Sequence, residues 1–194
     1  MEVKKISVSV EGLSSVMFDK FYDHSNENRP PERKFYTDNP VCLPVENIYS
    51  FLYRDAAPVG AVRFVEKRKA KEYLAMGQAF MSIRQTMIPF LDESYKPILF
   101  NGFGKFDSDS RFYVNDWEAG ITKMSGGKII KQEARPRPVM KLPWNLEFEV
   151  MLFENDKVTP DKLLSWFQIG GLVIAIGTHR PQYGRFMIKK WKVE

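Results

Sequence analysis

The residues best suited to binding chemistry lie in one segment near the end of the chain, Gly177 to Phe186, which reads GTHRPQYGRF. Glycines flank a polar loop and let backbone amides approach an anion closely. Arg180 and Arg185 supply bidentate donors suited to phosphate. His179 and Tyr183 offer flat rings on which a base can stack. These types predict a nucleic-acid-binding loop formed by Gly177, His179, Arg180, Tyr183, Gly184 and Arg185. The same residues also suit a purely structural turn.

Positive charge gathers in the C-terminal half of the chain. The net charge is +5, and the stretch 176–193 carries arginines and lysines with no acidic residue. Arg135 and Arg137 alternate with prolines, which keep this basic stretch extended. We expect both to assist in binding phosphates, and we expect Arg180 to be exposed because its loop is flanked by glycines. A solvated basic face is the alternative interpretation.

Several classes of function lack their signatures in this sequence. The phosphate-binding loop, the Gly-x-Ser-x-Gly elbow and the His-Glu-x-x-His motif are absent. With two histidines and the single cysteine Cys42, we expect no metal site and no cofactor. One cysteine fits a reducing compartment, and no apolar run is long enough to cross a membrane. The expected location is therefore the cytoplasm.

Three strands and two helices must position the basic loop. Val3–Val10, Trp144–Phe153 and Arg185–Val193 alternate apolar and polar residues, as half-buried strands do. Pro44 begins a predicted helix that ends near Ala57, and Thr159-Pro160-Asp161 begins another that runs to Val173. We expect the three strands to share one sheet, with the second helix packed on one face.

The middle of the chain predicts further elements with less regular patterns. We expect a long loop over 23–40, a short helix within 63–76, a strand over 78–91, and two strands within 112–130 around Ser125-Gly126-Gly127. The fold class that accounts for this order is α+β: a ferredoxin-like (RRM-like) antiparallel sheet with helices on one face and long insertions. We expect one domain over 1–194 with an inserted region around 61–140. An unrelated α+β sandwich is the alternative.

The C-terminal segment resembles the signature of the RAMP superfamily, the ferredoxin-like RNA-binding subunits of CRISPR effector complexes. Gly177, Arg180, Tyr183, Gly184 and Phe186 match its pattern of a helix and a glycine-rich loop leading into the last strand. The chain departs from the pattern at Ala175 and Gln182. The resemblance covers about 25 residues and implies RNA binding, with self-association or assembly with other CRISPR-type subunits. The ending also looks like that of phage-borne proteins of this type.

A second match, Thr37-Asp38-Asn39-Pro40-Val41, resembles the segment that cleaves target RNA in type III backbone subunits. The resemblance implies a catalytic role for Asp38, although Asp-Asn-Pro is also a common turn. The leading hypothesis is a non-catalytic protein that binds single-stranded nucleic acid, RNA in preference to DNA. The alternatives are an endoribonuclease that uses Asp38 and a viral protein that mimics or blocks a CRISPR subunit.

Overall fold

The computed structural model describes residues 2–20, 29–37, 39–56, 58–116, 121–125, 128–133 and 135–194. Its strands are β1 (Glu2–Gly12), β2 (Val16–Met17), β3 (Cys42–Pro44), β4 (Met81–Ile83), β5 (Met87–Leu91), β6 (Phe112–Asn115), β7 (Ile121–Ser125), β8 (Lys128–Glu133), β9 (Arg137–Met140), β10 (Asn145–Glu154) and β11 (Phe186–Val193). Its helices are α1 (Val45–Tyr53), α2 (Ala61–Glu66), α3 (Ala70–Phe80) and α4 (Pro160–Val173), with 3-10 helices η1 (Pro31–Lys34) and η2 (Lys67–Lys69). None of the helices in these ranges has the length and apolar character that a membrane crossing requires.

The central sheet joins strands that are far apart in the sequence. Its order is β11-β1-β10-β5-β3, and β4 also pairs with β10. Strand β1 lies between β10 and β11 and is antiparallel to both. The three strands expected to share a sheet therefore do so, and the α+β, ferredoxin-like architecture is confirmed.

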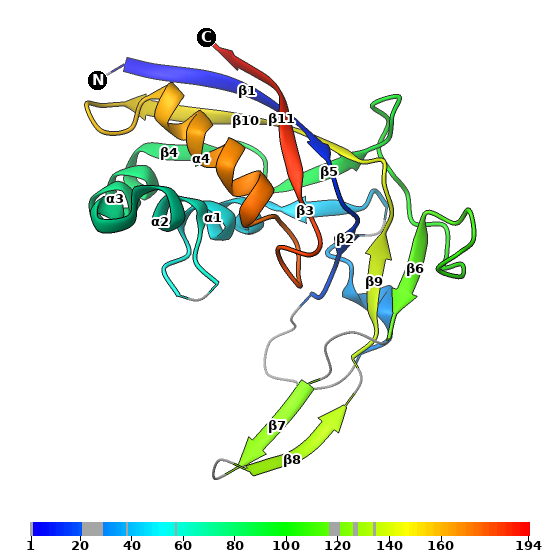
Figure 1. Cartoon of the computed structure of the whole chain (residues 1–194). Helices are drawn as coiled ribbons and strands as arrows, with labels where there is room; N and C mark the ends of the chain where they lie inside the picture. The colour runs from blue at the N-terminus through cyan, green and yellow to red at the C-terminus, as the bar shows by residue number, and fades with distance from the viewer. Residues whose placement is uncertain are drawn as a thin grey trace.

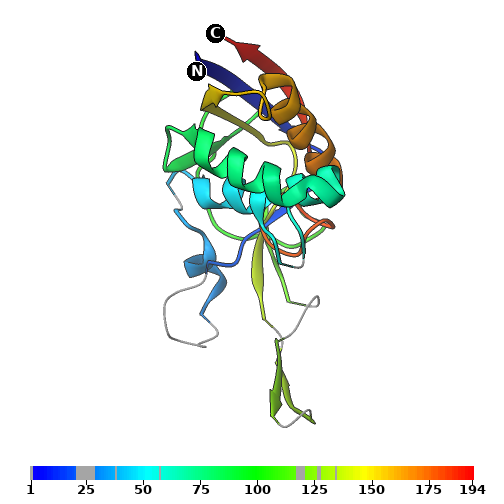
Figure 2. The same ribbon diagram turned by 90° about the vertical axis from the view of Figure 1, so that its left-hand side faces the viewer.

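The helices cover one face of this sheet (Figures 1 and 2). Helix α4 begins as predicted: Pro160 is the first helical residue, and the Thr159 side chain accepts a hydrogen bond from the Lys162 amide. Phe167 of α4 packs against Phe51 of α1 and Phe148 of β10, with ring centroids 5.6 and 6.0 Å apart. The aromatic stripe of α4 therefore joins the helix layer to the sheet.

The middle of the chain differs from the sequence-based prediction at several elements: α2, η2 and α3 take the place of one short helix within 63–76, and β6 precedes the two hairpin strands β7 and β8. The single strand expected over 78–91 is wrong, because α3 continues to Phe80 and two separate strands, β4 and β5, follow. Helix α3 continues because its buried face includes Leu74 and Gly77, and Gly77 lies directly against the Tyr53 ring. A Cβ atom at Gly77 would come within 2.6 Å of that ring.

Two smaller sheets lie beside the central one. Strands β2, β9 and β6 form a three-stranded sheet, and β7 pairs with β8 as a hairpin. The hairpin was expected around Ser125-Gly126-Gly127; its two strands are observed, and the two glycines lie outside the described residues. It projects from the end of the molecule opposite the chain termini (Figure 1). The insertion boundaries at 61 and 140 remain a prediction.

Candidate nucleic-acid interface

The basic loop connects α4 to β11 and has an unusual backbone. Residues Ala175, Gly177, His179 and Gly184 all have positive φ, at 66°, 77°, 55° and 77°. Position 184 requires glycine for two reasons: its φ is positive, and a Cβ atom there would lie 1.9 Å from the Ile176 carbonyl oxygen. The loop is therefore held in one shape by its glycines.

Some loop amides are used by the fold and others are not. Thr178 donates to the Met17 carbonyl at 3.0 Å, and Gly184 donates to the Ser15 carbonyl at 2.8 Å. These bonds fasten the loop to the segment after β1, so these two amides do not face an anion as the sequence suggested. The amides of Gly177, His179 and Arg180 have no acceptor within the described part of the chain. These three amides can therefore donate hydrogen bonds to a bound anion.

Arg180 is half-buried, in contrast to the exposed position expected for it. Its guanidinium donates to the Ala175 carbonyl at 3.4 Å. Burial lowers the pKa of Arg180, and the nearby positive charge of Arg54 lowers that pKa further. Among the described residues neither arginine pairs with a carboxylate. Two positive charges held near each other repel, and a bound anion would lower their electrostatic energy.

Arg54 and Arg180 both line a cavity of about 780 Å³. Helix α1 supplies one wall through Asn47 and Ser50, whose spacing places them on one face of the helix, and Arg54 follows directly after its last residue. The loop supplies the facing wall. The complete lining is Asp19, Lys20, Tyr36, Pro44, Glu46, Asn47, Ser50, Arg54, Pro58, Gly177, Thr178, His179 and Arg180. The cavity wall therefore combines apolar surface with charged groups, and more of its charged side chains are cationic than anionic.

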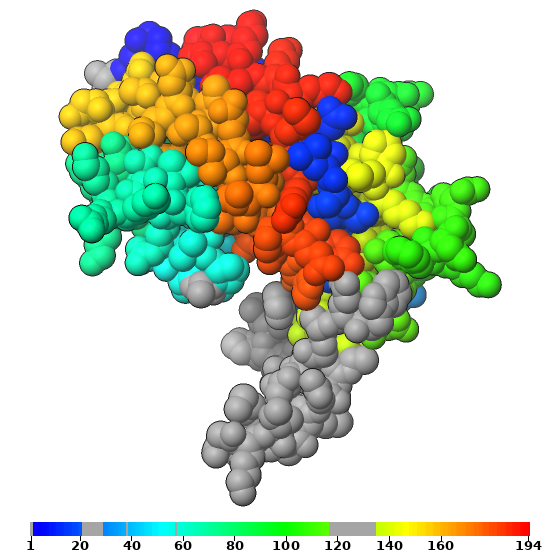
Figure 3. Space-filling model, in the orientation of Figure 1, coloured from blue at the N-terminus to red at the C-terminus, as the bar shows by residue number. Residues whose placement is uncertain are grey.

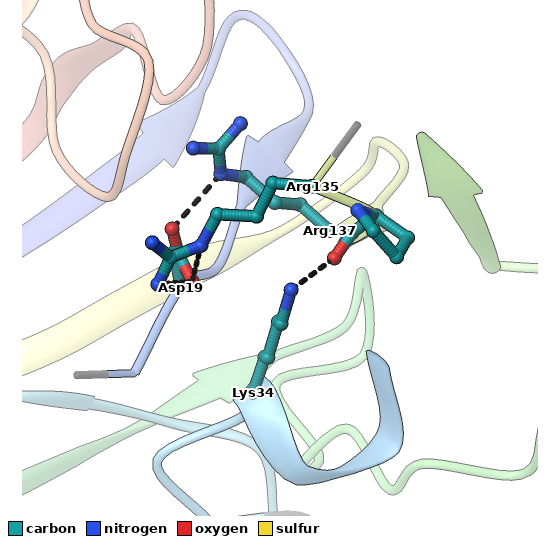
Figure 4. Close-up of polar contacts among 5 residues, drawn as sticks. Asp19, Lys34, Arg135 and Arg137 are labelled. Atoms are coloured by element: carbon teal, nitrogen blue, oxygen red, sulfur yellow. Dashed lines mark hydrogen bonds and ion pairs between the residues drawn. The ribbon is translucent and has the colours of Figure 1, made fainter. Parts of the chain in front are cut away.

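Arg135 and Arg137 converge on one carboxylate, Asp19 (Figure 4). Arg135 donates to Oδ1 through Nε at 3.2 Å and through a terminal nitrogen at 3.0 Å, and Arg137 donates to Oδ2 through Nε at 2.9 Å. The Asp19 side chain is 1% exposed, and the arginine side chains are 17% and 12% exposed. Both guanidinium groups thus lie mostly inside the protein; their expected contact with phosphate remains a prediction.

Lys34 completes this buried group. Its side chain donates to the Pro136 carbonyl, between the two arginines in sequence (Figure 4). Burial lowers the pKa of Lys34 to about 8, with smaller and opposing effects from Asp19, which raises it, and from the arginines, which lower it. We call Asp19, Lys34, Arg135 and Arg137 the buried charge cluster. Within it the Asp19 carboxylate, which borders the cavity, is paired with both arginines.

The two remaining loop side chains have different environments. Tyr183 is buried with Met17, Tyr113 and Val139, and its hydroxyl accepts a hydrogen bond from the Asn115 side chain at 3.0 Å. The open ring expected for base stacking is therefore not present at Tyr183, because this ring fills a small core. Arg185 is exposed, and its Nε donates to the Pro181 carbonyl at 2.9 Å. His179 is half-buried at the cavity wall.

The proposed nuclease residue Asp38 lies outside the described residues. Across the ranges that the structure describes, no group of three or more histidine, cysteine, aspartate or glutamate side chains could hold a metal ion.

Comparison with known proteins gives a likeness in structure. No protein-family model matches the chain, and no curated protein matches its sequence. The chain is similar in structure to a chain in the cryo-EM structure of the type III-B Cmr-beta bound to cognate target RNA. The TM-score is 0.51 and the identity 13%, over 99% of this chain and 61% of the solved chain. This likeness shows a common fold, in which the present chain spans about 61% of the length of the other.

Sequence reasoning missed Arg54, Asp19 and Lys34. Arg54 directly follows α1 and is separated by more than 120 residues from the loop with which it lines the cavity, so no local pattern joins it to Arg180. Asp19 and Lys34 lie in stretches without periodicity. The only available signal was the helical spacing of Asn47, Ser50 and Arg54, which places three polar side chains on one face of the predicted helix.

Proposed function

We propose that this chain binds single-stranded nucleic acid, RNA in preference to DNA, without cleaving it. The observation that carries the proposal is that Arg54 and Arg180, from separate elements, line one cavity, and neither has a carboxylate partner in the described chain. Such a pair suits phosphate oxygens because guanidinium groups form bidentate, charge-assisted hydrogen bonds.

The path of the strand follows from the exposed cations near the loop. One phosphate lies at the mouth of the cavity against Arg180 and Arg54, and the next lies against Arg185, which is exposed beyond the loop. Arg135 and Arg137 add long-range attraction from the buried charge cluster and exchange partners only if the strand displaces Asp19. The RNA preference is supported by the similar fold in the Cmr-beta structure, which is bound to target RNA. By analogy, we place the chain among CRISPR-related RNA-binding subunits.

A protein-binding role is the second candidate, and a separate surface favours it. Helix α4 exposes Ile169, Leu172 and Val173, and Phe64 of α2 is 47% exposed. Figure 3 shows α4 next to the α2–α3 region on one face of the molecule. Apolar side chains grouped on a surface are typical of subunit contacts. This surface supports assembly with a second copy or another CRISPR-type subunit, or the blocking role of a viral mimic.

Salt-dependent binding tests the proposed function. Fluorescence anisotropy with single-stranded RNA, single-stranded DNA and duplex at several salt concentrations gives the slope of log K against log salt. Each neutralised phosphate contributes roughly −0.7 on a single strand, so the two phosphates held by the Arg54–Arg180 pair and by Arg185 predict a slope of about −1.4. The double variant Arg54→Ala, Arg180→Ala should flatten the slope by about 0.7, and each single variant by less.

Arg84→Ala is the matched control, because this arginine is 79% exposed and lies beside Glu149 of the central sheet, away from the cavity lining. It should leave the slope unchanged. If the double variant Arg54→Ala, Arg180→Ala binds RNA as wild type does, the proposed function fails. RNA cleavage that is lost in Asp38→Ala would instead establish the endoribonuclease alternative.

A further inference from the structure

We infer that the cavity between α1 and the basic loop binds the phosphorylated end of a nucleic acid strand, taking one terminal nucleotide with its phosphomonoester against Arg54 and Arg180. This inference rests on the proposed function and specifies the ligand of the same site. It concerns a chemical group, the terminal phosphomonoester, that can be supplied by a 5′ end or by a 3′ end.

The first argument is charge. A phosphodiester within a strand carries one negative charge, whereas a terminal phosphomonoester carries about −1.5 to −2 and has three free oxygens. Arg54 from the end of α1 and Arg180 from the loop bring two guanidinium groups to one cavity, and Lys20 also lies at its wall. Of the two carboxylates at the wall, Asp19 is already paired with Arg135 and Arg137. A doubly charged group matches this arrangement better than a singly charged one.

The second argument is the supply of neutral donors. The amides of Gly177, His179 and Arg180 have no acceptor among the described residues, and all three residues line the cavity. Three oxygens of a monoester can use such donors together with the guanidinium groups. A bridging phosphodiester has only two free oxygens to offer.

The third argument is size. A cavity of about 780 Å³ falls within the range of roughly 300–1,000 Å³ that single small ligands occupy. It suits one nucleotide and not a run of several. Asn47 and Ser50 on α1 face the loop across this space and supply polar groups for the sugar and base. The cavity therefore suits the end of a strand, while Arg185 outside it holds the next phosphate.

The test compares one single-stranded RNA sequence with a 5′-phosphate, with a 3′-phosphate and with hydroxyls at both ends. Competition anisotropy with the intact chain gives the affinities, and adenosine 5′-monophosphate and inorganic phosphate serve as minimal competitors. We expect one phosphorylated end to bind roughly tenfold tighter than the hydroxyl ends, as added charge-assisted hydrogen bonds imply. Adenosine monophosphate should compete better than inorganic phosphate, since it also fills the cavity.

Single-residue variants test which side chains cause the preference for a phosphorylated RNA end. Arg54→Gln changes an exposed side chain and should remove most of the preference for the phosphorylated end; Arg180→Gln should do the same, with its folding checked by circular dichroism. Arg185→Ala is the control: it should weaken all three RNAs equally and leave the preference unchanged. Equal affinity for the three RNAs, with salt-dependent binding retained, overturns this inference and leaves the proposed function standing. A preference that survives Arg54→Gln also overturns it. Absence of binding to every RNA removes both proposals.

Discussion

Asp19 offers the sharpest test of how this molecule is held together, because one carboxylate compensates a group of buried cations. We expect Asp19→Ala to destabilise the fold strongly. In wild type the Asp19 oxygens accept three hydrogen bonds, two from Arg135 and one from Arg137. Without the carboxylate, both guanidinium groups and the Lys34 ammonium remain in a site that is mostly shielded from water.

The expected size follows from the burial of the pair. Removing one partner of a buried ion pair costs about 3–5 kcal/mol, because the other charge remains uncompensated. Arg135 and Arg137 keep 17% and 12% of their side-chain surface exposed, so partial hydration reduces the loss. We therefore expect about 3 kcal/mol. With a urea slope of about 2 kcal/mol per M, the unfolding midpoint should fall by about 1.5 M.

Urea denaturation followed by tryptophan fluorescence measures this change, and a second substitution tests its cause. Lys34→Met removes one of the cations, so it should cost less in the Asp19→Ala background than in wild type. Glu46→Ala is the control, since Glu46 is an exposed carboxylate at the same cavity. A loss below about 0.5 kcal/mol for Asp19→Ala would refute the reasoning, as would strict additivity of the two substitutions.

Three further predictions concern single residues. Lys34 has its pKa lowered to about 8 in the folded state, so between pH 8 and the ordinary value near 10.5 the unfolded chain binds more protons. Wild-type stability should therefore rise with pH in this window, by up to about 3 kcal/mol relative to Lys34→Met in parallel urea titrations; a flat difference contradicts the shift. Gly184→Ala should lower the melting temperature much more than Gly102→Ala, because both have positive φ but only Gly184 has a carbonyl, that of Ile176, in the place of the new Cβ. Equal shifts in the two variants would mean that space is not the cause. Tyr183→Phe should lower the free energy of unfolding by about 1 kcal/mol and leave RNA affinity unchanged, because the ring is part of a core. A large loss of RNA affinity would show instead that Tyr183 contacts RNA.

The sequence contained enough information for the framework of the fold. Alternation along β1, β10 and β11 predicts half-buried strands, and Thr159 followed by Pro160 predicts where α4 begins. These patterns are local, since a strand shows its two faces every second residue and a helix cap lies within four residues. The shift from α3 to β4 near residue 80 was missed because it depends on Gly77 packing against Tyr53, a contact between different helices.

The candidate site was only partly visible in the sequence. The glycine-flanked loop and its arginines could be identified from residue types, because positive φ and phosphate donors have characteristic residues. The sequence could not show which side chains are available to bind a ligand, because this depends on contacts with residues far away in the chain. Asp19 lies 116 residues before Arg135 and holds it inside the protein, and Asn115 contacts Tyr183 across 68 residues. The tertiary structure alone brings Arg54 to Arg180, since burial and long-range electrostatics are set by the assembled fold and not by any local pattern.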